Sequence, residues 1–485
     1  MDRDLFEHYF EDEDRLGPAA DDAFTGAAGG AACGDYSRLS LRIEDGRICD
    51  VSFDTEGCGA TRAATAAVAE MVDGATPLDA ARIGIDEAAD ALGGLIPSKR
   101  HAAQLASDAL HRALSQAAAS RLSLAPDRDS APNRVAVAMS GGVDSAVAAL
   151  LERERGAEVV AITVKLWADP ETDGTKACCS PEAVLGARGL AHTLGIPHFT
   201  LDLEEEFRRR VVDRFIDGYA SGSTPNPCIL CNGEVRIAAM LDLAERLGAE
   251  RLVTGHYAGI VEDGEGPLLV AGSDPAKDQS YMLAALPPDL LGRLSFPLTE
   301  MTKAEVRAVA ERHGLPVARK AESQDLCFLA GQGKSGFLRR HGGLSDREGA
   351  VLDTAGRTLG RHRGHHNFTV GQRRGIGVSA DEALYVVATD AAANTITVGA
   401  KEDLETSRIE VRDAVLHRPG DRVDAVRLRY HSRALPARVE AAPGRHSRLS
   451  VELEEPFTAA SPGQTAVLLA GEAVVGHGTI AATAA

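Results

Sequence analysis

A glycine-rich loop between a strand and a helix constrains this chain more than any other feature. Residues 134–151 read RVAVAMSGGVDSAVAALL. The apolar run at 135–139 predicts a buried strand, SGGVDS at 140–145 a loop, and the Ala- and Leu-rich stretch after it a helix. Adjacent glycines let backbone N–H groups turn toward a ligand, and the helix presents its positive N-terminal end. Such a loop binds pyrophosphate, but the lysine and spacing of a Walker A loop are absent.

Length and composition indicate a protein of several domains. The chain has 485 residues and a net charge of −19, which argues against a general nucleic-acid binder. The acidic charge is concentrated in the first 133 residues, so the Arg-rich C-terminal part can still hold RNA. No stretch is apolar for long enough to cross a bilayer, and MDRDLFEHYFEDEDR is unlike a signal peptide. We therefore expect a soluble cytoplasmic protein whose eight cysteines are reduced thiols.

The order of strand and helix patterns predicts the fold class. Alternating β and α patterns after the loop predict a doubly wound, mostly parallel sheet with ligands at the carboxyl ends of its strands. Short strands follow, first in a small central unit and then with the even spacing of an antiparallel barrel. A hairpin and Ala-rich helices in front predict an α+β module. The predicted units are an acidic solvated tail at 1–25, the module at 26–118, a linker at 119–133, an ATP-binding catalytic domain at 134–345, a central β-rich domain at 346–406 and a β-barrel at 407–485.

Four potential metal ligands stand at predicted strand ends and helix starts of the module: Cys33, Asp35, Cys58 and His101. Cys33-Gly-Asp35, Gly57-Cys58-Gly59 and Lys99-Arg-His101 together resemble the NifU/IscU-type iron–sulfur scaffold family over residues 26–118. That family places a cysteine directly after the histidine, where this chain has Ala102, so a cluster would lose one thiolate ligand. The four residues could instead hold zinc. Alternatively, the module is a docking platform for a sulfur donor and binds no metal.

Five further motifs follow the SGGVDS loop: TPNPCILCN at 224–232, TGHY at 254–257, KDQSY at 277–281, the S-x-x-x-C-F segment at 323–328 and GQRRGIG at 371–377. Together with SGGVDS they make the region 134–485 resemble the tRNA-specific 2-thiouridylase family of PP-loop ATP pyrophosphatases. This resemblance implies ATP-dependent 2-thiolation of the wobble uridine of tRNA, with Mg²⁺. It also implies a sulfur donor as partner, such as a cysteine desulfurase or a sulfur-relay protein.

The resemblance assigns roles to individual residues. Cys231 is the implied nucleophile, Cys327 carries the persulfide sulfur, and Asp144 lies near the Mg-bound phosphates. The implied ATP site comprises Ala138, Met139, Ser140, Gly141, Gly142, Val143, Asp144, Ser145, Val164 and Gly255. The implied tRNA contacts are Asn226, Pro227, Cys228, Lys277, Asp278, Gln279, Arg429 and Tyr430.

The chemistry of these residues is consistent with sulfur replacing oxygen, and it leaves the sulfur carrier open. Adenylation makes O2 of uracil a leaving group, and a Cys327 persulfide can then attack C2 and leave a Cys231–Cys327 disulfide. Alternatively, Cys228, Cys231 and Cys327 could hold a four-iron four-sulfur cluster with one open iron site. Cys231 is expected near a helix start, which lowers a thiol pKa. Other hypotheses are a PP-loop synthetase that amidates or thiolates a small molecule, and a non-catalytic iron–sulfur carrier.

Thr302, with Glu305 three residues later, predicts the capped start of a helix over residues 302–313.

Several further residues receive structural predictions. Arg427, Arg429 and Tyr430 are expected on one strand, where an aromatic ring beside positive charge suits an unstacked nucleotide. His365-His366 is interpreted as a polar loop, because no partner ligands have suitable spacing. Cys178-Cys179 is expected at a helix entry after a mobile loop, with a structural role.

Overall fold

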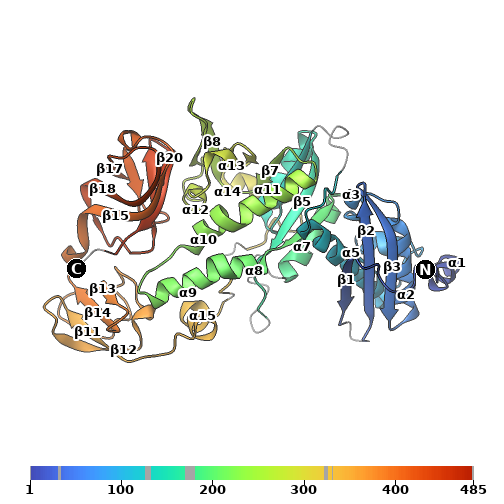
Figure 1. Cartoon of the computed structure of the whole chain (residues 1–485), viewed down its shortest axis with the longest axis horizontal. Coiled ribbons are helices and arrows are strands. Elements are labelled where there is room, and N and C mark those ends of the chain that lie inside the picture. The colour runs from blue at the N-terminus through green and yellow to red at the C-terminus, as the bar shows by residue number, and fades with distance from the viewer. Residues whose placement is uncertain are drawn as a thin grey trace.

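The computed structural model describes residues 2–30, 34–125, 133–169, 181–321, 326–329 and 331–482. Four folded units follow one another along the molecule (Figure 1). The N-terminal module lies at one end, the parallel-sheet domain in the middle, and the two β-rich units at the other end. This architecture confirms the predicted fold class. No helix within the described ranges is long and apolar enough to cross a membrane.

The N-terminal module is a three-stranded antiparallel sheet covered by helices. Its strands pair in the order β1-β2-β3, and alternate residues of β2 and β3 are buried because one face of the sheet packs against α2 and α5. Gly26 permits the close approach of α5, since a Cβ there would lie 2.0 Å from the carbonyl oxygen of Ala109. The elements are β1 (Phe24–Gly29), β2 (Tyr36–Glu44), β3 (Arg47–Glu56), α2 (Gly59–Val72), α3 (Pro77–Ala80), α4 (Ile85–Asp90) and α5 (Arg100–Ala119).

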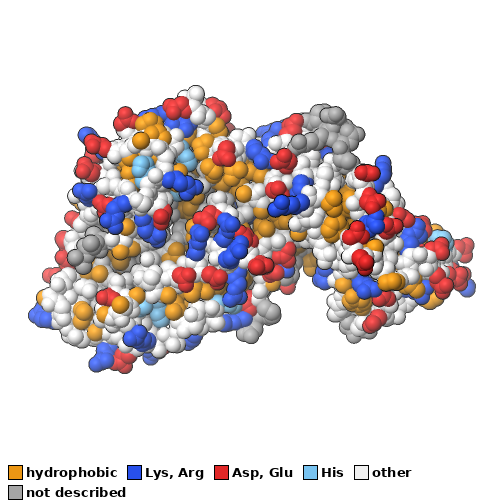
Figure 2. Space-filling view, in the orientation of Figure 1, with side chains coloured by type: hydrophobic (Ala, Val, Ile, Leu, Met, Phe, Trp, Pro, Cys, Tyr) orange, Lys and Arg blue, Asp and Glu red, His pale blue; other side chains and the backbone are white. Residues whose placement is uncertain are grey.

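The acidic segment at the N-terminus was expected to be a solvated tail with one helical turn around residues 5–10, and the structure has a longer helix there. Residues Arg3–Phe10 form helix α1, and the Asp2 side chain accepts hydrogen bonds from the first-turn N–H groups. The aromatic residues of this helix recur at helical spacing, so Phe6 and Tyr9 pack against the core of the module. The acidic side chains remain outside, where Figure 2 shows them gathered at this end of the molecule.

The middle domain contains the predicted parallel sheet, with strand order β10-β7-β4-β5-β6. Val135 and Val137 point into a core shared with α6 and α14, whereas Ala136 points into the core that contains α11. All strands are parallel, but the order of their addition reverses at the central strand β4: β5 and β6 follow on one side of it, and β7 and β10 on the other. The loops after β4 and β7 therefore separate and leave a ligand site. The elements are β4 (Arg134–Ala138), β5 (Glu158–Lys165), β6 (His198–Asp202), β7 (Arg251–Thr254), β10 (Leu294–Ser295), α6 (Val143–Glu154), α7 (Pro181–Thr193), α12 (Ser280–Leu283), α13 (Pro288–Leu291) and α14 (Lys303–Arg312).

Two long helices of this domain each contain a π-helical stretch. The first comprises α8 (Glu204–Phe207), π-helical Arg208–Val212 and α9 (Asp213–Ala220). The second comprises α10 (Pro227–Leu230), π-helical Cys231–Arg236 and α11 (Ile237–Arg246). The sequence patterns predicted helices here but not the π-helical stretches, which occur often at functional sites.

The module is fixed on the edge of the parallel sheet, because α5 packs along edge strand β6. A buried ion pair between Arg188 of α7 and Asp108 of α5 crosses this contact. Near the end of α5, Arg246 donates from Nη2 to the carbonyl oxygen of Ala118 over 2.6 Å. The covered edge is therefore protected from pairing with other chains.

The C-terminal part contains the two expected β-rich units. A four-stranded sheet has the order β12-β11-β14-β13 and follows helix α15 (Gly333–Gly342). Six strands in the order β15-β18-β17-β16-β19-β20 close into a barrel through pairing of β15 with β20. The strands are β11 (Gly349–Asp353), β12 (Thr358–His362), β13 (Tyr385–Asp390), β14 (Thr395–Gly399), β15 (Glu405–Leu416), β16 (Ala425–Arg427), β17 (Leu435–Arg438), β18 (Gly444–Thr458), β19 (Thr465–Ala470) and β20 (Ala473–Ile480).

The barrel is joined to the middle domain by sheet pairing. The hairpin of β8 (Ala258–Glu262) and β9 (Pro267–Ala271) leaves the middle domain, and β9 pairs with β20 of the barrel. Buried Arg418 reinforces this joint through hydrogen bonds of 2.9 and 2.7 Å to Asp263 of the hairpin. The two ion-paired guanidinium groups of Arg418 and Arg422 hold the pKa of the Asp263 carboxyl well below its usual range.

Candidate functional site

The SGGVDS loop has the geometry of an anion site. Gly141 has φ +67°, which a residue with a side chain rarely adopts, and a Cβ there would lie 3.3 Å from the backbone nitrogen of Ala187. The Ser145 hydroxyl fixes the turn by accepting from the Ser140 N–H over 3.2 Å and donating to the Gly142 carbonyl over 3.2 Å. No side chain caps α6, so its first N–H groups can bind phosphate oxygens.

Two lysines without a predicted role lie at the SGGVDS loop, together with Tyr257 of the TGHY motif. Lys303 donates from Nζ to both carboxylate oxygens over 2.7 and 2.8 Å, and the Tyr257 hydroxyl donates to Oδ1 over 2.8 Å. Lys320 donates to the Gly141 carbonyl over 2.9 Å. These lysines bring positive charge to the place where pyrophosphate would leave. Lys303 had a weak sequence signal, because it follows the recognised helix cap Thr302.

Val164 and Gly255 are the two residues of the implied ATP site outside residues 138–145, and they differ in their surroundings. Gly255 lies against the start of α6, where a Cβ would be 2.7 Å from both the carbonyl carbon of Asp144 and the nitrogen of Ser145. Val164 is buried near the end of β5 and contributes to the core. His256, beside Gly255, is held neutral because burial and the neighbouring Arg236 lower its pKa to about 3.

The TPNPCILCN segment begins the second long helix. Asn226 caps it by accepting from the N–H groups of Cys228 over 3.1 Å and Ile229 over 3.4 Å, and Pro227 occupies the first helical position. Cys228 therefore lies in the first turn. Cys231 was expected near the helix start, but it lies a turn further on, is buried, and begins the π-helical stretch.

Cys327 is half-buried in a turn that an aromatic cluster anchors. Its neighbour Phe328 is 1% exposed, and its ring lies 5.1 Å from that of Phe215 and 4.9 Å from that of Phe337. Phe207 of α8 also contacts Phe328, and the same helical segment packs against the π-helical stretch that begins at Cys231. The segments of Cys231 and Cys327 thus flank one helix. Residues 322–325 lie outside the described ranges.

Two of the expected tRNA-contacting residues, Asp278 and Gln279, make hydrogen bonds within the protein. Asp278 is buried and accepts from Arg427 of the barrel over 2.8 Å, and Gln279 exchanges hydrogen bonds of 3.0 and 2.9 Å with the backbone of Tyr257. A connected path therefore leads from Asp144 through Tyr257 to the barrel. Lys277 is half-buried.

Tyr430 brings the barrel close to the second long helix, residues 227–246, which carries Cys228 and Cys231 and is called the cysteine helix below. Burial raises the pKa of its hydroxyl, and Asp278 and Cys228 lie close enough to Tyr430 to add to the effect. The expectation that Arg427, Arg429 and Tyr430 share a strand is wrong, because β16 ends at Arg427 and the other two lie in the following turn. This turn lets Tyr430 reach Tyr281, at 6.0 Å between ring centroids.

Three of the predicted metal ligands in the module meet. Ligand atoms of Asp35, Cys58 and His101 lie within 4.8 Å of one another. His101 faces the Ser98 carbonyl with Nδ1 over 3.1 Å and Asp35 Oδ2 with Nε2 over 3.1 Å. Because a carbonyl can only accept, the hydrogen bond assigns the proton to Nδ1, which leaves the lone pair of Nε2 facing the carboxylate with room for a cation between them.

The donor set of this cluster fits zinc better than an iron–sulfur cluster. Sulfur, oxygen and nitrogen ligands suit four-coordinate Zn²⁺, whereas Ala102, which is fully buried, supplies no thiolate. Cys33 and Cys178-Cys179 lie outside the described ranges. Within those ranges no second group of three His, Cys, Asp or Glu residues meets the same distance limit, so His365-His366 does not join such a group.

The parallel sheet, the uncapped SGGVDS loop and the attached barrel define a class, that of PP-loop α/β proteins with C-terminal β-domains. Sequence profiles agree with it: a NifU-like N-terminal domain matches residues 2–122, a tRNA methyl transferase HUP domain residues 133–331, a tRNA methyl transferase PRC-barrel domain residues 335–400, and an aminomethyltransferase β-barrel domain residues 418–480.

Individual relatives extend the match over the whole chain. The chain is 45% identical to the bifunctional protein NifU/MnmA of Rubrobacter xylanophilus, over 94% of this chain and 93% of the relative. It is 41% identical to the tRNA-specific 2-thiouridylase MnmA of Geobacter metallireducens, over 73% of this chain and 98% of the relative. The chain therefore belongs to the MnmA family, in the form that carries a NifU-like domain in front.

Similar solved structures cover single units. The N-terminal part of a NifU-like protein from Brucella abortus is 22% identical over 22% of this chain and 75% of that chain, with a TM-score of 0.16. NMN synthetase from Francisella tularensis is 18% identical over 43% of this chain and 73% of that chain, with a TM-score of 0.25.

Proposed function

We propose that this protein is an ATP-dependent tRNA-uridine 2-sulfurtransferase that acts on the wobble uridine. The observation that carries the proposal is the hydrogen-bonded path from the nucleotide loop to the barrel, with the cysteine helix joined beside it, where Arg236 donates to His256 Nε2 over 3.1 Å. Asp144 binds Tyr257, Tyr257 binds Gln279, and the adjacent Asp278 binds Arg427. A nucleotide cleaved at the loop and a base held near Cys228 and Tyr430 would thus belong to one site. The relatives named 2-thiouridylases support this substrate.

The first step adenylates the base. Uracil O2 attacks the α-phosphorus of ATP, the bond from the α-phosphorus to the bridging oxygen breaks, and pyrophosphate leaves. The N–H groups at the start of α6 and the ammonium groups of Lys303 and Lys320 offset its charge. Asp144 would hold the Mg²⁺ that accompanies ATP, which would offset charge on the phosphates. In this structure the Lys303 ammonium contacts the Asp144 carboxylate.

The second step replaces oxygen with sulfur. The outer sulfur of a Cys327 persulfide attacks C2, and AMP leaves with the original O2. The Cys231 thiolate then attacks the Cys327 sulfur, which breaks the S–S bond, leaves sulfur on the base and forms a Cys231–Cys327 disulfide. An external thiol reductant reopens it, and a sulfur donor protein reloads Cys327. The target base must leave its stack to reach these groups.

A cluster held by Cys228, Cys231 and Cys327 remains the alternative sulfur carrier, and would supply an open iron site for sulfide. Cys228 distinguishes the two routes, because only the cluster needs it as a ligand. Anaerobically purified wild type and Cys228→Ala are compared for iron, sulfide and 2-thiouridine formation. Persulfide chemistry predicts little iron in either protein and retained thiolation. Cluster chemistry predicts that the variant loses iron and activity together.

Cysteine variants test the proposed function itself. Cys231→Ser and Cys327→Ser should still release pyrophosphate from ATP in the presence of tRNA, but should form no 2-thiouridine by nucleoside mass spectrometry. Cys49→Ser is the matched control, because Cys49 lies half-buried on β3 of the module. Thiouridine formation by Cys231→Ser would contradict the assigned nucleophile. Adenylation of a small molecule without tRNA would favour the synthetase alternative.

The NifU-like module is proposed to serve sulfur or metal handling. Asp35, Cys58 and His101 would hold one zinc ion, which would keep the Cys58 thiolate deprotonated. The metal site begins at the N-terminal end of α5, whereas the contact of Ala118 with Arg246 lies 17 residues later. At 1.5 Å per residue this is about 25 Å along α5, so sulfur handled at the module's site would need a mobile carrier to reach this contact with the middle domain.

A further inference from the structure

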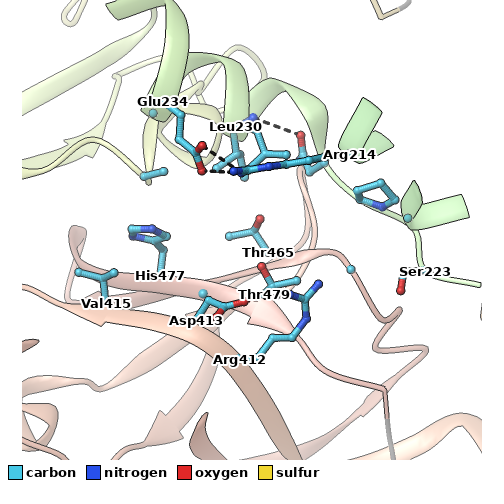
Figure 3. A pocket seen from close by; sticks show the side chains of 18 of the residues that line it. Arg214, Ser223, Leu230, Glu234, Arg412, Asp413, Val415, Thr465, His477 and Thr479 are labelled. Atoms are coloured by element: carbon cyan, nitrogen blue, oxygen red, sulfur yellow. Dashed lines mark hydrogen bonds and ion pairs between the residues drawn. The ribbon is translucent and has the colours of Figure 1, made fainter. Parts of the chain in front are cut away.

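A large cavity lies behind the cysteine helix, on the side away from Cys228. Its volume is about 720 Å³. One wall is the face of the cysteine helix that carries Ile229, Leu230 and Gly233, and the other wall is the barrel. Figure 3 shows His477, Thr479 and Arg412 rising from the barrel toward Leu230 and Glu234 of the helix.

Five polar side chains of this cavity make no side-chain hydrogen bond within the described part of the protein. The hydroxyl groups of Ser223, Thr465 and Thr479 and the imidazoles of His417 and His477 make no side-chain hydrogen bond there. Burial lowers the pKa of His477 to about 4 and also lowers that of His417, so both rings are neutral near pH 7. Neutral imidazole and hydroxyl groups both donate and accept, which suits an uncharged polar ligand group such as a hydroxyl.

Positive charge on the barrel wall is available as well. Arg445 of β18 stands opposite Val415 of β15 and forms no ion pair among the described residues. Arg412 of β15 is paired only with its exposed neighbour Asp413, a contact of small net value that another anion can replace. On the opposite wall Arg214 of α9 and Glu234 of the cysteine helix satisfy each other through two hydrogen bonds of 2.9 Å. Asp217 of α9 also lines this wall, so the positive charge available to a ligand is on the barrel.

We propose that this cavity binds a ribonucleotide of the RNA substrate that flanks the modified base, with Arg412 and Arg445 on its phosphates and His477 and Thr479 on its ribose 2′-hydroxyl. The inference deepens the proposed function and rests on it. Arginines, hydroxyls and neutral histidines beside an apolar wall match phosphate, ribose and base in turn. Because the cavity and Cys228 use opposite faces of one helix, the occupant would press on the helix that positions the cysteines.

RNA binding by the full chain tests the proposal. Arg412→Ala and Arg445→Ala should each weaken tRNA binding about 5- to 10-fold and reduce the slope of log K against log salt by about 1. Thr479→Val should weaken binding about 3-fold without a change in slope, because it removes no charge. Arg408→Ala is the matched control, since Arg408 lies on the same strand, is ion-paired with Glu410 and does not line the cavity.

A sugar scan separates ribose recognition from general charge. Anticodon stem-loops with a single 2′-deoxy nucleotide at each loop position are titrated against wild type and Thr479→Val. At one loop position the 2′-deoxy substitution should weaken binding to the wild type, but it should not further weaken binding to Thr479→Val. The proposal would be overturned if both arginine variants, with a folded circular dichroism spectrum, bound tRNA with the affinity and the salt slope of the wild type. Absence of tRNA binding by the wild type would instead overturn the proposed function.

Discussion

Replacement of Gly255 by alanine should impair the nucleotide loop through steric overlap alone. The new Cβ would lie 2.7 Å from the carbonyl carbon of Asp144 and the nitrogen of Ser145. Both are backbone atoms at the start of α6, so no side chain can rotate out of the way. Since ordinary contact begins near 3.4 Å, β7 and α6 must separate by about 0.7 Å.

The size of this displacement sets the expected effect. A misplacement of about 1 Å in a reacting group costs on the order of 100-fold in rate, so we expect kcat/KM for ATP to fall between about 10- and 100-fold. Overpacking of a well-packed region costs about 1–3 kcal/mol of unfolding free energy. The folded protein should therefore survive with a lower Tm.

The assay is tRNA-dependent pyrophosphate release as a function of ATP concentration, with Tm recorded for each variant. Gly189→Ala is the matched control, because Gly189 lies in helix α7 and a Cβ there meets nothing within 4 Å. That variant should keep full activity and gain up to about 1 kcal/mol in stability. A Gly255→Ala protein with wild-type kcat/KM for ATP would refute the assigned position of this glycine against the loop.

Three further predictions concern the metal site, the module contact and the Cys327 turn. Asp35→Ala or Cys58→Ser should lower zinc content, measured by elemental analysis, from about one ion per chain toward zero. Burial lowers the pKa of His111 well below its usual value, whereas in the unfolded chain this imidazole takes up a proton below about pH 6.5. Between pH 7.5 and 5.5 the free energy of unfolding should therefore fall by about 1.4 kcal/mol because of this residue. In urea unfolding, His111→Gln should abolish this part of the pH dependence. Phe328→Ala should cost about 3–5 kcal/mol locally and slow thiouridine formation, while pyrophosphate release stays near the wild-type rate; equal loss of both steps would contradict the anchoring role of Phe328.

Local sequence patterns were sufficient where short-range physics determines the structure. Alternation and a turn predicted the hairpin of β2 and β3, and the capping box of Thr302 and Glu305 predicted the start of α14. The glycine loop, its strand and its helix were also predicted, because each is encoded within a few neighbouring residues.

Contacts between distant segments could not be predicted in this way. Lys303 reaches Asp144 across 159 positions, and an exposed-looking lysine in a first helical turn carries no mark of that role. Tyr430 was expected to continue a strand, but the barrel ends β16 early and turns the ring toward the middle domain. The packing of the acidic segment could not be predicted for the same reason, since its aromatic residues become a packing face only when α2 is present.

The pairing of β9 with β20 affects how this protein can be dissected. A shortened chain that ends before residue 405 would leave β9 with a row of unpaired backbone groups where β20 now pairs. An exposed strand edge can pair with the edge of another chain, and Asp263 would also lose its ion pair with Arg418. Inactivity of that fragment would then reflect self-association rather than a missing RNA surface, so single substitutions on the barrel are the cleaner way to measure its contribution.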